Sequence, residues 1–92
     1  MRPDRLTSIA DEYMASTLTP SFTPDARARL NSFLADAATR VDGDDRVQVA
    51  RAEAETRMLT ERLGRTARGG AVDVTIVQIE IRGLCPIWPF CQ

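Results

Sequence analysis

The sequence predicts a mainly α protein, in which a small three-helix domain is followed by one C-terminal β-strand arm and a Pro/aromatic/Cys tail. Three observations lead to this prediction. Apolar residues recur at three- and four-residue spacing through residues 4–66, as on helical faces. Residues 72–82 are instead dense in Val and Ile, which favour strands. The tail, residues 84–92, carries prolines that oppose regular structure. We therefore expect a helical domain over residues 1–68 and a strand with an anchor tail over residues 69–92.

Periodicity places the three helices at about residues 4–18, 23–41 and 44–66. The second helix has the clearest start. Thr23 offers a capping oxygen, Pro24 suits the first helical position because its missing N–H would be unpaired there, and Asp25 lies against the positive end of the helix dipole. Asp44 is expected to cap the third helix.

The third predicted helix carries two apolar stripes instead of one. The first stripe contains Val47, Ala50, Ala54 and Met58, and the second contains Ala52, Leu59 and Leu63. Its apolar surface is therefore broad but shallow, which suits close packing between helices.

Residues 72–82 predict a long strand with an internal change of face. Its first half points Val72, Val74 and Ile76 to one side, and its second half points Val77, Ile79 and Ile81 to the other. Either a β-bulge realigns the halves, or each half buries a different face. The sequence contains no second strand signal, so the backbone N–H and C=O groups of this strand require a partner protein or a second copy of the chain.

The tail concentrates the single Trp of the chain, both Cys and two prolines in its last nine residues. Aromatic side chains held by proline-stiffened backbone lose little entropy on binding, so we expect Ile87, Trp88 and Phe90 to enter a pocket on the partner. The alternative is that the tail folds back over the chain's own helices, because a domain this small needs apolar cover. The predicted partner-binding residues are Val77, Ile79, Ile81, Ile87, Trp88 and Phe90.

Cys85 and Cys91 are candidates for modification or for a disulfide. Closing the short loop between them as a disulfide restricts the unfolded chain by about 2 kcal/mol, although a reducing cytosol opposes the bond. Zinc would need further ligands from a second chain or a partner, since two Cys supply half of a tetrahedral site. The Cys85-Pro86 dipeptide also resembles a haem-regulatory motif. The remaining interpretation is that both thiols are substrates of a modifying enzyme. We predict no metal site and no cofactor.

The composition excludes several functional classes. The chain has no His for general base chemistry, no phosphate-binding Gly-rich loop and no nucleophile with an adjacent base, so we expect no catalytic residues and no enzyme. A net charge of −1 with interleaved Arg and acidic residues gives no basic field for nucleic acid. The use of 12 Arg without Lys is typical of a GC-rich bacterial genome. Because neither a secretory signal nor a run of 18 apolar residues occurs, we predict no membrane span and a cytoplasmic protein.

Two functions fit this pattern. The first is a small non-enzymatic accessory or assembly subunit that binds a protein partner, or itself as a homodimer, through the strand and the tail. The second follows from a resemblance in architecture. A charged helical front, Gly69-Gly70 and a C-terminus dense in Cys, Trp, Phe and Pro resemble the leader-and-core plan of precursors of ribosomally synthesised, post-translationally modified peptides. That resemblance implies a helical leader and a C-terminal core that an enzyme modifies.

Overall fold

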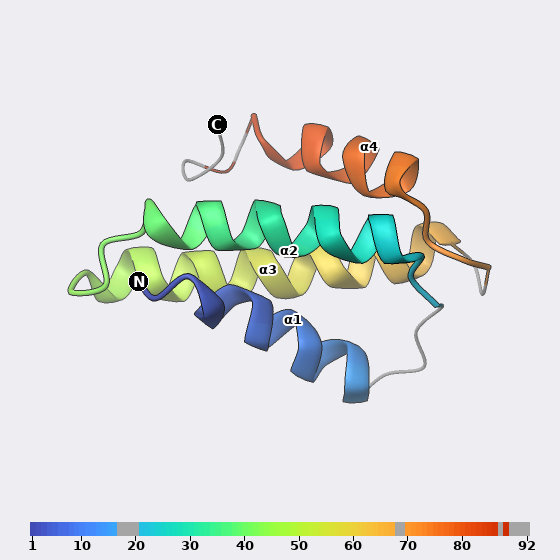
Figure 1. Ribbon diagram of the computed structural model, residues 1–92. Helices are drawn as coiled ribbons and strands as arrows, with labels where there is room; N and C mark the ends of the chain where they lie inside the picture. Colours follow the sequence, from blue (N-terminus) through green and yellow to red (C-terminus); the bar gives the residue numbers. More distant parts are fainter. Residues whose placement is uncertain (17–20, 68–69, 87, 89–92) are drawn as a thin grey trace.

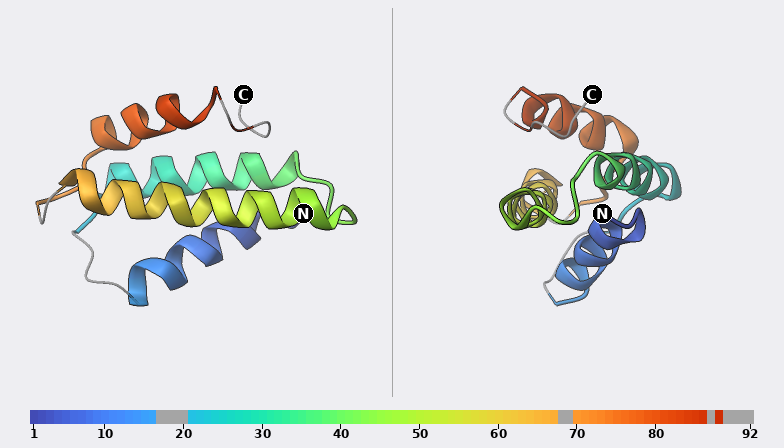
Figure 2. Two further views of the ribbon diagram at one scale, coloured as in Figure 1. Left: turned by 180° about the vertical axis from the view of Figure 1, so that it is seen from behind. Right: turned by 90° about the vertical axis from the view of Figure 1, so that its left-hand side faces the viewer.

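The computed structural model describes residues 1–16, 21–67, 70–86 and 88 of the chain, and this part contains four helices. They are α1 (Asp4–Ser16), α2 (Pro24–Thr39), α3 (Arg46–Ala67) and α4 (Val74–Leu84). The helices α2 and α3 form a central layer, with α1 on one side of it and α4 on the other (Figures 1 and 2). The predicted mainly α class is confirmed.

The start of α2 follows its sequence signals, whereas the cap of α3 lies one residue later than predicted. Thr23 Oγ1 accepts a hydrogen bond from Ala26 N at 3.2 Å, and Pro24 is the first residue of α2. For α3 the cap is Asp45 and not Asp44, since Asp45 Oδ1 accepts from Val47 N at 3.0 Å. Asp44 instead belongs to the turn between α2 and α3, where its backbone N–H donates to Asp42 Oδ1 at 3.0 Å.

The strand predicted over residues 72–82 is wrong, because most of that segment forms α4. Asp73 initiates the helix by accepting a hydrogen bond from Ile76 N on Oδ1 at 2.9 Å. Val77, Ile81 and Leu84 then follow at helical spacing and are all buried. A face buried at this spacing stabilises a helix even when β-branched residues build it. The switch of the apolar residues from one strand face to the other at Ile76 and Val77 therefore results from helical periodicity and not from a β-bulge.

One bridge is the only strand-like pairing among the described residues. It joins Phe22 to Val72 in parallel. Val72 N donates to Ser21 O at 2.9 Å, and Thr23 N donates to Val72 O at 3.0 Å. Because the bridge lies just before both α2 and α4, the two helices leave it in the same direction (Figure 1).

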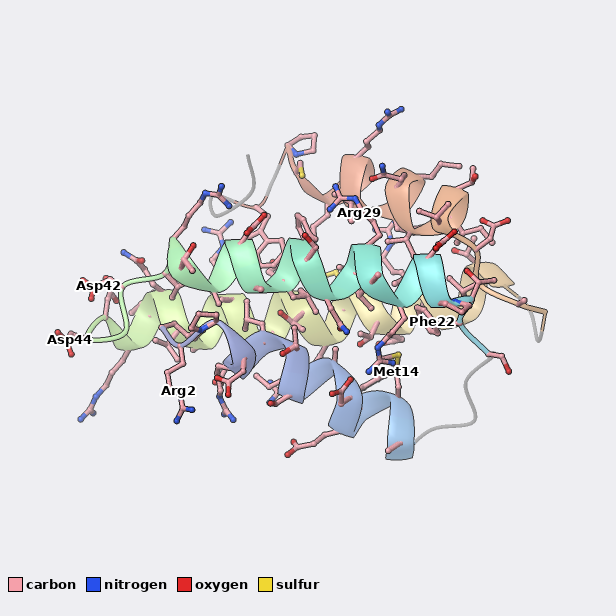
Figure 3. All side chains as sticks on the ribbon, viewed as in Figure 1. Arg2, Met14, Phe22, Arg29, Asp42 and Asp44 are labelled. Carbon is pink, nitrogen blue, oxygen red and sulfur yellow. The ribbon has the colours of Figure 1, made fainter. Side chains whose placement is uncertain are left out.

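Helix α4 is also held to the central layer by polar contacts. Arg29 reaches from α2 toward α4 (Figure 3), and its Nε donates to Gln78 Oε1 at 2.9 Å. From α3, Arg62 Nε and Thr66 Oγ1 each donate to one carboxylate oxygen of Glu80, both at 3.1 Å. The fourth helix is thus fixed to both helices of the central layer.

A single buried cluster includes residues from all four helices. Its largest fully buried apolar side chains are Leu6, Leu30, Leu34, Leu59, Leu63, Val72, Val77 and Trp88. Thr56 and Thr60 of α3 are buried among them, and each hydroxyl donates to a carbonyl of its own helix at 2.8 Å, from Thr56 to Ala52 O and from Thr60 to Arg57 O. None of the helices in the described ranges combines the length and the apolarity that crossing a membrane would take.

Candidate interaction surfaces

The three apolar residues that the sequence assigned to one binding face of a strand are separated by the helix. Val77 and Ile81 point into the core, where they are buried. Ile79 lies on the opposite side of α4 and is 59% exposed. In this fold only Ile79 of the three is available to a partner.

Trp88 lies in the chain's own core and not in a partner. Its side chain is 1% exposed and meets the ring of Phe33 on α2 edge to face, with centroids 5.3 Å apart and an interplanar angle of 66°. The Trp88 backbone N–H donates to Leu84 O at 3.1 Å. The fold-back alternative therefore describes Trp88 correctly. Ile87 and Phe90, the other two predicted anchors, lie outside the described residues.

Cys85 is disulfide-bonded and packs against the edge of the core. The second cysteine of the sequence, Cys91, lies outside the described residues. No three His, Cys, Asp or Glu side chains in the described part of the chain gather into a site that would hold a metal ion. The cytoplasmic location remains a prediction, and a disulfide is more common in oxidising compartments.

The two apolar stripes of α3 differ in their exposure to solvent. The stripe of Ala52, Leu59 and Leu63 is buried. The other stripe stays on the surface, with Val47 77% exposed, Met58 39% exposed, and Ala50 and Ala54 exposed between them. We call these four residues the outer stripe. At about 100° per residue they fall on one face of α3 over roughly three turns.

Charged residues of both signs border the outer stripe, since Glu53 follows Ala50 by three residues and Glu55 precedes Met58 by three. By helical spacing Arg46 and Arg57 flank one edge, and Arg51 flanks the other. The side chains of Arg46 and Arg57 are exposed and make no ion pair or hydrogen bond with any other described residue. At its C-terminal end the stripe meets Glu61, which pairs with Arg65 at 3.6 Å.

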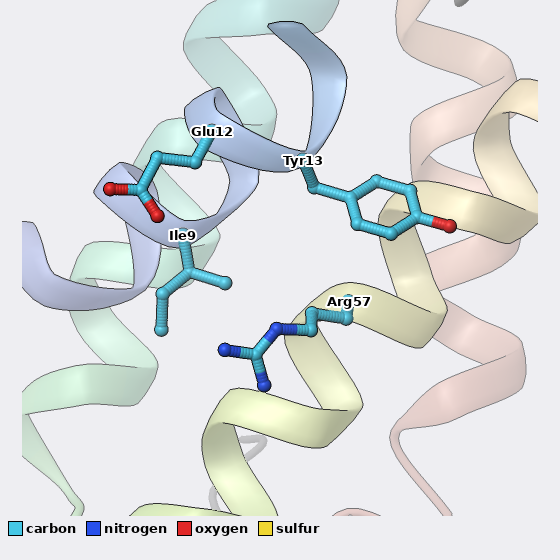
Figure 4. A pocket seen from close by; sticks show the side chains of 4 residues that line it. All are labelled: Ile9, Glu12, Tyr13 and Arg57. Carbon is cyan, nitrogen blue, oxygen red and sulfur yellow. The ribbon is translucent and has the colours of Figure 1, made fainter. Parts of the chain in front are cut away.

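Arg57 also lines a depression between α1 and α3, shown in Figure 4. Its volume is about 300 Å³, and its other lining residues are Ile9, Glu12 and Tyr13. The Glu12 carboxylate is turned away from the Arg57 guanidinium, and no ion pair joins them among the described side chains. The depression therefore combines a buried aliphatic side chain, Ile9, with the polar groups of Glu12, Tyr13 and Arg57.

The outer stripe was visible in the sequence as one of two apolar stripes, but nothing in the local pattern showed which stripe the other helices would cover. Comparison with protein families, characterised proteins and solved structures finds no match to this chain.

Proposed function

We propose that this protein is a small non-enzymatic accessory subunit that binds another protein through the outer stripe of α3. The observation that carries the proposal is the exposure of Val47 and Met58 on the same face of a helix whose opposite face forms the core. Single exposed apolar residues are common, whereas an aligned set at helical spacing is the pattern by which helices recognise partners.

Pairing with the edge of a partner sheet, the mode first expected of residues 72–82, has no support in a helical α4. Ile79 is the one residue of that expected binding face that remains exposed. A protein partner is therefore better sought at α3, where exposed apolar side chains extend over several turns.

A non-enzymatic role is supported by the side chains that the sequence offers. Without His, general acid and base catalysis at neutral pH would depend on carboxylates or Tyr. Glu12 is the one acidic residue among those that line the depression of Figure 4, and its side chain is exposed. A shallow depression with one exposed carboxylate suits contact with a protein surface better than chemistry on an enclosed substrate.

The precursor hypothesis is weakened by the position of Trp88. A core peptide must reach a modifying enzyme, but the Trp88 ring is buried against Phe33. The intact mass of the protein from its native host separates the two functions. A mass equal to that of the sequence, less the hydrogens lost in a disulfide, supports the accessory subunit, and a shortened or otherwise modified C-terminus supports the precursor.

Site-specific photocrosslinking in the native host tests the binding surface. Val47 is replaced by a photoreactive phenylalanine analogue, and the exposed Asp36 of α2 is replaced in a matched control. We expect a specific crosslinked protein from position 47 only, and its loss when Met58→Glu is added, because a charge on the stripe opposes desolvation. Equal crosslinking from both positions, or crosslinking at 47 that survives Met58→Glu, would show that the outer stripe is not the binding surface.

A further inference from the structure

We infer that the outer stripe binds a second copy of this chain, and that the two α3 helices pair antiparallel about a two-fold axis near Ala54. This inference rests on the proposed function, because it names the protein that occupies the outer stripe. It is carried by the place of α3 in the molecule, by the register that the stripe allows, and by the charges along the helix.

The place of α3 leaves room for a second copy to approach. In the right-hand view of Figure 2, α3 and α2 lie at opposite sides of the molecule, and the outer stripe is on the face of α3 opposite its buried stripe. One helix from each copy makes a contact at the small end of protein interfaces, so we expect a reversible dimer with a Kd on the order of 10–100 μM.

The side chains of the stripe fit an antiparallel register centred on Ala54. When Ala54 lies on the two-fold axis, residues equally far before and after it face each other. Ala54 then meets Ala54 of the second copy, where small side chains let the two backbones come close. On either side of this point Ala50 meets Met58 of the second copy, so a small side chain faces a large one.

The same register places unlike charges together. Val47 faces Glu61 of the second copy, so the neighbouring Arg46 lies at the level of that carboxylate. Arg46 makes no ion pair with any other described residue of its own chain, and Glu61 pairs with the exposed Arg65 at 3.6 Å. Because the axis repeats each contact, the dimer contains two pairs of Arg46 with Glu61.

The charges at the two ends of α3 favour the antiparallel orientation over the parallel one. Residues 42–46, at its N-terminal end, contain three Asp and one Arg and carry a net charge of −2. Residues 61–65, at its C-terminal end, contain one Glu and two Arg and carry a net charge of +1. An antiparallel pair brings the acidic end of each copy to the basic end of the other, whereas a parallel pair brings like ends together.

Sedimentation of the full chain at concentrations from about 1 μM to about 1 mM tests whether the dimer forms. We expect a reversible change from monomer to dimer across this range, and a weaker dimer as added salt screens the charges. Met58→Glu should keep the chain monomeric, because it puts a carboxylate into the apolar contact with Ala50 of the second copy.

A charge swap tests the register. Arg46→Glu and Glu61→Arg should each weaken the dimer by about tenfold, because each sets like charges together twice. An equimolar mixture of the two variants should regain the original affinity, since every such contact between the two different chains again joins unlike charges. Arg82→Glu and Asp36→Arg make the same charge changes at exposed sites outside α3 and should leave the dimer intact. Circular dichroism checks that all variants keep the helical fold, which is expected because the replaced side chains are exposed.

Three outcomes would overturn the inference. The first is a chain that stays monomeric up to about 1 mM. The second is a dimer that Met58→Glu leaves unchanged, because the contact would then lie elsewhere. The third is a mixture of the two charge variants that associates no more tightly than either variant alone. If the chain is monomeric but photocrosslinking at position 47 captures a different protein, the proposed function stands and only the second copy is wrong.

Discussion

Trp88 illustrates why a single residue can be misplaced by sequence reasoning. Its position near the C-terminus and its proline neighbours favoured an anchor for a partner, yet the indole is buried against Phe33. The covering residue lies on α2, far away in the sequence, and no local pattern links the two rings. An edge-to-face aromatic pair adds about 0.5–1.5 kcal/mol to the stability that burial alone provides.

Replacing this ring should destabilise the fold strongly. We expect Trp88→Ala to lower the free energy of unfolding by about 3–5 kcal/mol, because it removes a large buried side chain and leaves a cavity against Phe33. Guanidinium unfolding followed by circular dichroism measures the change. Ile79→Ala is the control, and at 59% exposure it should change the stability by no more than about 0.5 kcal/mol. Similar effects of the two substitutions would show that the indole is not part of the core.

At the level of elements, α1, α2 and α3 were predictable and α4 was not. The first three have clear helical periodicity. The predicted end of the first helix, residue 18, lies outside the described residues, and the other predicted bounds differ from the observed ones by at most two residues. In residues 72–82 the composition favoured a strand, while two helical signals were also present. Asp73 stands at the capping position, and Val77, Ile81 and Leu84 follow helical spacing. Composition is the weaker guide because burial of one face outweighs propensity differences of a few tenths of a kcal/mol per residue.

The cap of α4 provides a direct test of this helix. Asp73→Ala should lower the free energy of unfolding by about 1 kcal/mol, because Ile76 N loses the carboxylate oxygen that lies 2.9 Å away. Asp73→Asn should retain most of the stability, since the amide oxygen also caps. Thr75→Ala removes an exposed side chain inside the helix and should cause no loss, because Ala has the higher helix propensity. Thermal unfolding of the three variants gives the comparison, and an Asp73→Ala protein as stable as Thr75→Ala would argue against the capped helix.

For the whole molecule, the position of α4 determines which surfaces remain free. The helices α1 and α4 lie on opposite sides of the central layer, and each covers the side of α3 that faces it (Figure 2). The outer stripe of α3 stays exposed to solvent. The sequence identified both stripes of α3, but the choice between them depends on where α1 and α4 pack. The predicted binding surface at Val77 and Ile81 was wrong for the same reason, since those residues close the core.

The central claim is that the segment after α3 closes the protein's own core and so leaves the outer stripe for a partner. Multidimensional NMR of the full chain in solution tests it most directly. The account predicts helical carbon chemical shifts through residues 74–84 and nuclear Overhauser effects between the Trp88 indole and the Phe33 ring, at a protein concentration where the chain is monomeric. Extended-strand shifts over residues 74–82, together with an indole that shows no contact to Phe33, would contradict it and return the C-terminal segment to the role of a partner-binding arm.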